Sequence, residues 1–244
     1  MARIPRKLKS DPIVEALFEV RFVSGEIPEI VLGKLASSEN WKDFPSQRLP
    51  LADVPAAIRE SDPNLLYQPV LQLQHKDGAR VMKIGPRVFS YHALRPYPGW
   101  TVFEPELHSS IEYVFRTLKD VTATRFGFRY INVLTQNHLI DGVANLNFDV
   151  HLANNPMTDP LNLNYQRRWS PKHNSTVRVA SIEFVQNPAA DLTALVDVDI
   201  FTPLDFKSTE EADTRAWITD AHNFLKQEFF TLLPDSIIDK LEEK

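Results

Sequence analysis

Charged side chains at strand spacing are the first feature of the sequence that could support chemistry. Glu15, Glu19 and Arg21 alternate with apolar residues near the N-terminus, and Arg125 and Arg129 do so near the middle of the chain. Because side chains two residues apart share one face of a strand, each group would line one side of a sheet. Guanidinium groups bind phosphates and carboxylates through paired hydrogen bonds. One hypothesis is therefore a cleft in which the three arginines bind an anion and the two glutamates orient them or hold a metal ion.

The same five residues also fit a purely structural role. If the two strands pair, carboxylates on one strand can lie opposite guanidinium groups on the other. Such cross-strand pairs contribute on the order of 0.2–1 kcal/mol each and fix the register. We favour this ion-pair ladder. An excess of arginine over local acid in a concave surface would indicate the anion site instead.

A second group of carboxylates comprises Glu183, Asp197 and Asp199, on two strands expected to form a hairpin. Several carboxylates on one sheet face can hold Mg²⁺. Acidic side chains on strands more often only contact solvent, so we expect no metal site and keep these three residues as weak candidates. No cofactor is expected either, because the chain has 7 glycines and neither a glycine-rich phosphate loop nor a dinucleotide fingerprint.

Two further groups were weighed for catalysis and for contacts with a partner. Ser90 and His92 stand two residues apart in a strand pattern, without the turn that exposes a catalytic serine, so His92 is expected to be a packed or edge residue. Arg167, Arg168 and Trp169 stand in a loop-like polar region and are the candidate contact surface for a partner.

The overall charge argues against a nucleic-acid-binding protein. The net charge is −5, and the second half of the chain, residues 123–244, holds 11 basic and 17 acidic residues. General nucleic-acid binding needs a basic face. The chain has no cysteine, which excludes disulfides and thiolate chemistry, and no apolar run near the roughly 20 residues of a membrane helix. A cytoplasmic protein without membrane contact is expected.

The pattern of apolar residues predicts an α+β fold. Strands are predicted over 13–23, 65–74, 80–94, 124–134, 176–186 and 191–201, and helices over 26–38, 104–119 and 214–233. Glycine and proline at 85 and 86 indicate a bulge or a second short turn in the third strand. We therefore expect antiparallel sheet with helices packed on one face.

The two halves of the chain share one order of elements. Each begins with a strand of alternating charge and aromatic character, followed by a connection, a hairpin and a closing helix. This similarity predicts an internal duplication of a strand-(helix)-hairpin-helix unit. The expected organisation is a mobile basic tail over 1–12, a first repeat over 13–122 and a second over 123–244, packed as one unit.

Two short segments resemble a known family. The segment Pro12-Ile13-Val14-Glu15-Ala16 and the segment from Arg125 to Asn132, Arg-Phe-Gly-Phe-Arg-Tyr-Ile-Asn, are similar to the strand motifs of a sporadically distributed, functionally uncharacterised bacterial protein family of about this length. The resemblance implies a complete prokaryotic unit and supplies no catalytic residues. The patchy distribution of that family is typical of mobile or defence-type loci.

These observations favour a non-enzymatic binding or assembly module that acts with a protein partner or by self-association, in a defence-type or toxin–antitoxin-like locus. The alternative is a phosphate- or nucleotide-handling enzyme, or a ligand sensor, that uses the charged sheet face.

Overall fold

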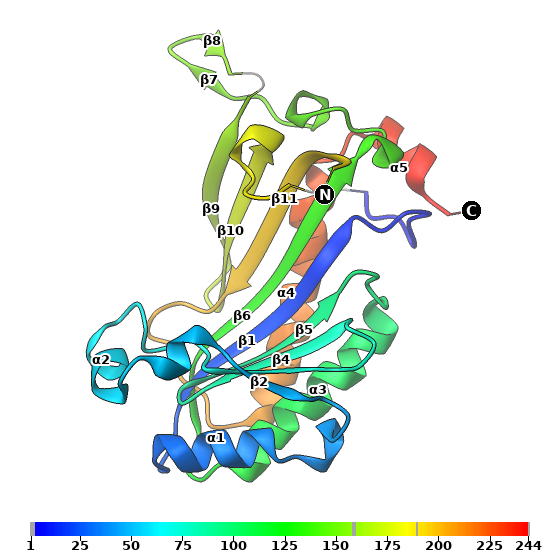
Figure 1. Cartoon of the computed structure of the whole chain (residues 1–244). Coiled ribbons are helices and arrows are strands. Elements are labelled where there is room, and N and C mark those ends of the chain that lie inside the picture. The colour runs from blue at the N-terminus through cyan, green and yellow to red at the C-terminus, as the bar shows by residue number, and fades with distance from the viewer. Residues whose placement is uncertain (1–2, 158–159, 189, 244) are drawn as a thin grey trace.

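A single large antiparallel sheet organises the protein, and the computed structural model describes residues 3–157, 160–188 and 190–243. Nine strands run in the order β2-β3-β4-β5-β1-β6-β11-β10-β9, and the helices α3 and α4 cover one face (Figure 1). The strands are β1 (Ile13–Val23), β2 (Ser46–Arg48), β3 (Leu71–Gln74), β4 (Arg80–Gly85), β5 (Val88–Leu94), β6 (Thr122–Thr135), β7 (His151–Leu152), β8 (Asn155–Pro156), β9 (Asn162–Ser170), β10 (His173–Ser181) and β11 (Leu192–Phe201). The helices are α1 (Pro28–Ala36), α2 (Ala56–Ser61), α3 (Trp100–Thr117), α4 (Glu211–Thr231) and α5 (Asp235–Leu241). The predicted α+β class is confirmed.

The two central strands show why the sheet has one apolar and one polar face. On β1, Phe18 and Phe22 are fully buried, and on β6 so are Phe126 and Phe128. The ring of Phe18 contacts those of Phe126 and Phe128, and Phe18 and Phe126 both contact the indole of Trp217 on α4. Because the side chains of a strand alternate, the charged residues between them point to the opposite face. The predicted split of both strands into a core face and a polar face is confirmed.

The helices that close the core come from both halves of the chain. Helix α3 packs on β5, α4 packs on β6 and β11, and the two helices touch each other. Helix α3 starts at Trp100, not at the predicted Glu104, because the extended chain ends at Gly99, whose φ of 87° suits glycine. Pro105 therefore lies inside the helix rather than in its first turn.

Apart from the short edge strand β2, the two halves of the main sheet have matching strand orders. The order β3-β4-β5-β1 in one half is matched by β9-β10-β11-β6 in the other, with α3 and α4 following the respective groups. Each half contains three sequential antiparallel strands where a hairpin was predicted. In the first half a tight turn follows Gly85, so residues 80–94 form two strands. The symmetric order is compatible with duplication, which stays a prediction because the halves share only a pattern.

The basic N-terminal segment is docked on the C-terminus. The N–H of Lys9 donates to the carbonyl of Leu241 at 2.9 Å, and the N–H of Glu243 donates to the carbonyl of Lys7 at 3.0 Å. Arg3 forms ion pairs with Asp239 and Glu242. The expected basic tail therefore makes backbone and ion-pair contacts with the C-terminal segment, and its mobility stays a prediction.

Candidate functional site

The register of β1 against β6 decides how the charged side chains meet. Arg21 lies opposite Arg125, and Glu19 lies opposite Gly127. The carboxylate therefore pairs diagonally rather than directly across. A Cβ atom at Gly127 would lie 2.4 Å from a terminal nitrogen of Arg125. The glycine thus leaves the space through which Arg125 reaches back over its own strand to Glu19.

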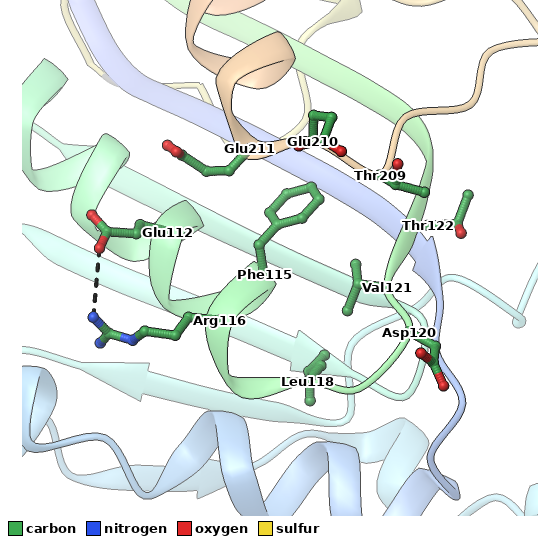
Figure 2. A pocket seen from close by; sticks show the side chains of 10 residues that line it. All are labelled: Glu112, Phe115, Arg116, Leu118, Asp120, Val121, Thr122, Thr209, Glu210 and Glu211. Carbon is green, nitrogen blue, oxygen red and sulfur yellow. Dashed lines mark hydrogen bonds and ion pairs between the residues drawn. The ribbon is translucent and has the colours of Figure 1, made fainter.

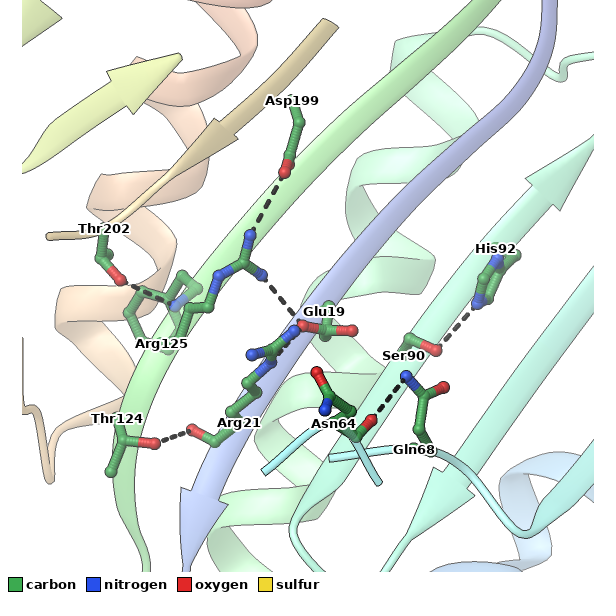
Figure 3. A network of polar contacts seen from close by, with 11 residues as sticks. Glu19, Arg21, Asn64, Gln68, Ser90, His92, Thr124, Arg125, Asp199 and Thr202 are labelled. Atoms are coloured by element: carbon green, nitrogen blue, oxygen red, sulfur yellow. Dashed lines mark hydrogen bonds and ion pairs between the residues drawn. The ribbon is translucent and has the colours of Figure 1, made fainter. Parts of the chain in front are cut away.

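The result is a chain of ion pairs along the polar face of the two central strands, of which Figure 3 shows Glu19, Arg21, Arg125 and Asp199. Oε1 of Glu19 accepts from Nε of Arg21 at 2.7 Å and from a terminal nitrogen of Arg125 at 2.9 Å. The other terminal nitrogen of Arg125 lies 3.2 Å from Asp199. Further along β6, Nε of Arg129 donates to Asp197 at 2.7 Å.

Each of the three candidate arginines is thus engaged by a carboxylate. Three guanidinium groups face three partner carboxylates, so the arginine excess that would indicate an anion site is missing among these six side chains. The guanidinium of Arg21 also stacks over the ring of Tyr67, and that of Arg125 over Phe201. An anion would have to displace a carboxylate before binding, and the geometry therefore favours the ladder.

Asp199 is the most perturbed member of the ladder. Burial raises the pKa of its carboxyl to about 6, although Arg125 and Arg129 oppose the shift. Neighbouring acids add to the increase in pKa. The carboxyl of Asp199 is therefore easier to protonate than that of an ordinary aspartate.

The fifth candidate, Glu15, has no ion pair with the three arginines and hydrogen-bonds to a histidine instead. Its carboxylate lies 2.6 Å from Nδ1 of His92, and Nε2 of His92 lies 2.8 Å from the hydroxyl of Ser90. Burial lowers the pKa of His92, and the hydrogen bond from His92 lowers the pKa of Glu15. The neutral imidazole is thus positioned to donate to Glu15 and to accept from Ser90.

This order of hydroxyl, imidazole and carboxylate is the order of a catalytic triad. Ser90 is only 6% exposed and His92 only 4%, and neither residue lines the cavities of about 640 and 780 Å³ described below. A nucleophile also needs room for a substrate and donors for an oxyanion. The group therefore works as a buried hydrogen-bond relay between β5 and β1. The structure shows His92 as a packed residue, the first of the two predicted alternatives. Its link to Glu15 was missed, since only the β1–β5 register brings the two together.

The weak metal candidates lie apart. Asp197 and Asp199 are paired with arginines on β6, and the residue opposite Asp197 on β10 is Arg178. Glu183 lies in a short 3-10 helix after β10, so it is not the cross-strand neighbour of Asp197 that the hairpin pattern suggested. Within residues 3–157, 160–188 and 190–243, no group of three or more potential metal ligands is found.

The candidate partner surface lies on the edge strand β9 rather than in a loop. The indole N–H of Trp169 donates to the buried carboxylate of Glu228 on α4 at 2.9 Å, and the ring stacks on Phe224. Arg167 lies 3.8 Å from the same carboxylate. Trp169 thus serves mainly the internal packing of β9 on α4. Arg168 is exposed, and alternation places it on the other face.

An acidic hollow lies at the far end of α3 (Figure 2). Its volume is about 640 Å³, and its walls carry the carboxylates of Glu112, Asp120, Glu210 and Glu211. The one basic side chain among its lining residues, Arg116, already pairs with Glu112 at 3.5 Å. Its charge disfavours anions, and the cluster by itself indicates no particular ligand.

Comparison with known proteins finds no family model that matches the sequence and no curated protein with significant similarity to it. The resemblance of the two strand motifs to the sporadic bacterial family therefore stays a prediction. No helix in the described part of the chain has the length and apolar character needed to cross a bilayer.

Proposed function

We propose that the protein is a binding and assembly module that adds a strand of a protein partner to the edge of its sheet. The observation that carries this proposal is the contrast between the two edges. Strand β2 has 3 residues, whereas β9 has 9 and pairs with β10 alone among the described strands. Long exposed edges attract further strands, and proteins that do not use them usually shorten or cover them.

The backbone of β9 offers hydrogen-bonding groups on its outer side. The N–H of Ser181 on β10 donates to the carbonyl of Leu161 at 2.8 Å, which marks this pair as hydrogen-bonded. Hydrogen-bonded and non-bonded pairs alternate along an antiparallel ladder. The amides of Asn162, Asn164 and Gln166 therefore point away from β10, and all three residues are exposed.

The side chains of β9 add selectivity to this backbone pairing. Arg168 is exposed and has no carboxylate partner among the described residues, and Arg167 is 47% exposed. A partner strand with acidic residues would match this end of β9, because charge complementarity directs the register of a strand pair. Peptides that bind by strand addition gain affinity from the main chain and specificity from such alternate side chains.

The test compares two substitutions at one position. Asn164→Pro removes the outward N–H and is tolerated on an edge strand, whereas Asn164→Thr keeps the N–H and suits a strand. A library of 12-residue displayed peptides is selected on the wild-type protein, and sedimentation velocity is measured over a range of concentrations. We expect enriched peptides, or a concentration-dependent dimer, to survive Asn164→Thr and to be lost in Asn164→Pro. Equal behaviour of the two variants, or no binding in either assay, would refute the proposal.

The proposal that the protein is encoded in a defence-type or toxin–antitoxin-like locus depends only on the family resemblance. The alternative, a phosphate- or nucleotide-handling protein, requires Arg21, Arg125 and Arg129 to exchange their carboxylate partners for a ligand. It has its own test below.

A further inference from the structure

A cavity of about 780 Å³ lies on the helix side of the sheet, away from β9. It is enclosed by the N-terminal segment from Pro5 to Ile13, by the loop that leads into α3 from Tyr97, and by α4 between His222 and Phe230. Cavities of roughly 300–1,000 Å³ are the usual size of small-molecule sites. It lies outside the proposed strand-addition edge.

Three polar side chains are linked in one wall of this cavity. The hydroxyl oxygens of Tyr97 and Tyr130 lie 3.1 Å apart, and the Tyr130 oxygen lies 3.1 Å from Nδ1 of His222. The indole of Trp100 stacks on the His222 ring, with 3.8 Å between centroids and 5° between planes. The imidazole is therefore fixed in orientation, and the three groups form a chain that ends at Tyr97.

All three groups of the chain are neutral at pH 7. Burial lowers the pKa of His222 to about 3 and raises the pKa of both tyrosines above the ordinary value of 10.0. A neutral imidazole can either accept from Tyr130 or donate to it. In the first arrangement Tyr97 ends the chain as an acceptor, and in the second it ends the chain as a donor. The cavity can thus satisfy either kind of polar group on a ligand.

The remaining walls are apolar, and the rim is basic. Trp100, Leu225, Phe229 and Pro12 supply aromatic and aliphatic surface. The basic residues among those that line the cavity are Arg6, Lys7, Lys9 and Lys226, and the acidic residues are Asp11 and Glu243.

Several rim cations are not neutralised. Lys7 pairs with Glu243 at 2.6 Å, whereas the ammonium of Lys9 donates only to the carbonyl of Lys240. Arg6 and Lys226 have no carboxylate bound to their side chains among the described residues. The rim therefore carries more positive than negative charge, in contrast to the balanced ladder on the other face.

The roof of the cavity is held in place without a ligand. Leu8 forms a strand-like bridge with Glu242, and the backbone bonds of Lys7 and Lys9 to the C-terminus lie on either side of it. A site that is formed before binding loses less conformational entropy when the ligand enters.

We propose that this cavity binds a small organic carboxylate with an aromatic body. The carboxylate would lie at the rim beside Lys226 and Arg6, the ring would lie against Trp100 and Phe229, and a polar group at the far end would bond to Tyr97. The charged rim selects the anion, the aromatic walls select the body, and the tyrosine chain selects the distal group.

The probe for the test is 3-(4-hydroxyphenyl)propionate, compared with the alcohol in which CH₂OH replaces the carboxylate. Binding is measured by calorimetry and by the change in total tryptophan fluorescence on the wild type, Lys226→Gln, Tyr97→Phe and the control Lys207→Gln. Lys207 is exposed and does not line the cavity, so its variant makes the same charge change elsewhere. Circular dichroism and the melting temperature show whether each variant is folded.

We expect the carboxylate to bind the wild type and Lys207→Gln equally and to bind Lys226→Gln about tenfold more weakly, a loss of about 1.4 kcal/mol. Tyr97→Phe should also weaken binding, and the alcohol should bind the wild type more weakly than the carboxylate. Absence of carboxylate binding at millimolar concentration, equal affinity for the alcohol, or equal effects of the two lysine variants would each overturn the proposal. These outcomes are independent of strand addition at β9.

Discussion

The protonation of His222 gives the most direct test of the cavity chemistry. The imidazole is held between Trp100 and Tyr130, and burial lowers its pKa from 6.5 to about 3. In the unfolded chain the same imidazole takes up a proton below about pH 6.5, whereas in the folded protein it stays neutral down to about pH 3. The unfolded state therefore binds more protons in this window, and stability falls as the pH falls from 6.5 towards 3.

The size of the effect follows from the width of that window. At pH 5.0 the difference from 6.5 is 1.5 pH units, and each unit corresponds to about 1.36 kcal/mol. His222 should therefore cost the folded state about 2 kcal/mol at pH 5.0 relative to pH 7.5. His222→Phe keeps an aromatic ring against Trp100 and removes the titrating group, so this part of the pH dependence should disappear.

The assay is urea denaturation followed by tryptophan fluorescence at pH 7.5, 6.5 and 5.0. The wild type should lose about 2 kcal/mol more than His222→Phe between the two ends of this range. A second variant, His151→Gln, removes an exposed histidine and controls for the substitution as such. If the stability curves of the wild type and His222→Phe run parallel within 0.5 kcal/mol, the imidazole is not buried and neutral, and the reasoning is refuted.

Three further predictions concern the buried acid on α4 and the ladder. Glu228→Ala removes the acceptor of three side-chain donors on β9 and β10 and should lower the free energy of unfolding by about 2–4 kcal/mol in urea denaturation, with Glu228→Gln in between. Arg129→Ala leaves the 10%-exposed Asp197 without its partner and should lower the free energy of unfolding by about 1–3 kcal/mol. Any thermal shift that pyrophosphate causes in the wild type should be unchanged in this variant. Loss of such a shift would favour the phosphate-handling alternative. Gly127→Ala should cost about 1 kcal/mol in the wild type and much less in an Arg125→Ala background, and equal costs in a double-mutant cycle would contradict the close approach of that guanidinium.

The central strands were predictable because burial acts on them with a period of two. Phe18 and Phe126 could be assigned to the core, and Glu19 and Arg125 to the opposite face, without knowing which strands are neighbours. The pairing of β1 with β6 was an assumption that the structure bears out. The expected direct opposition of carboxylates and guanidinium groups was wrong, since the pairing depends on a register that alternation leaves open, and that register places Glu19 opposite Gly127.

Interactions between segments that are far apart in the chain could not be predicted from the pattern of residue types. The hydrogen bond between Glu15 and His92 depends on the β1–β5 register, which the sequence does not show. The alternating pattern predicts only that Ser90 and His92 lie on the same face of their strand. The C-terminal part of strand β9, from Arg167 to Trp169, was interpreted as a loop. An edge strand needs few apolar residues, so its composition can be as polar as that of a loop. The basic N-terminal segment was expected to be a tail because its acidic partners stand at the opposite end of the chain.

The distribution of charge shows where ligands are most favoured. On the central face, Arg21, Arg125 and Arg129 meet carboxylates within hydrogen-bonding distance, and a ligand there must replace bonds that already exist. At the β9 edge and at the rim of the cavity, the backbone amides and Lys226 have no such partners among the described residues. Binding at these places adds interactions without first breaking others, which lowers its free-energy cost. The conspicuous charges of the sequence are therefore already paired on the sheet, and the two binding sites that we propose lie at the edge of the sheet and under its N-terminal segment.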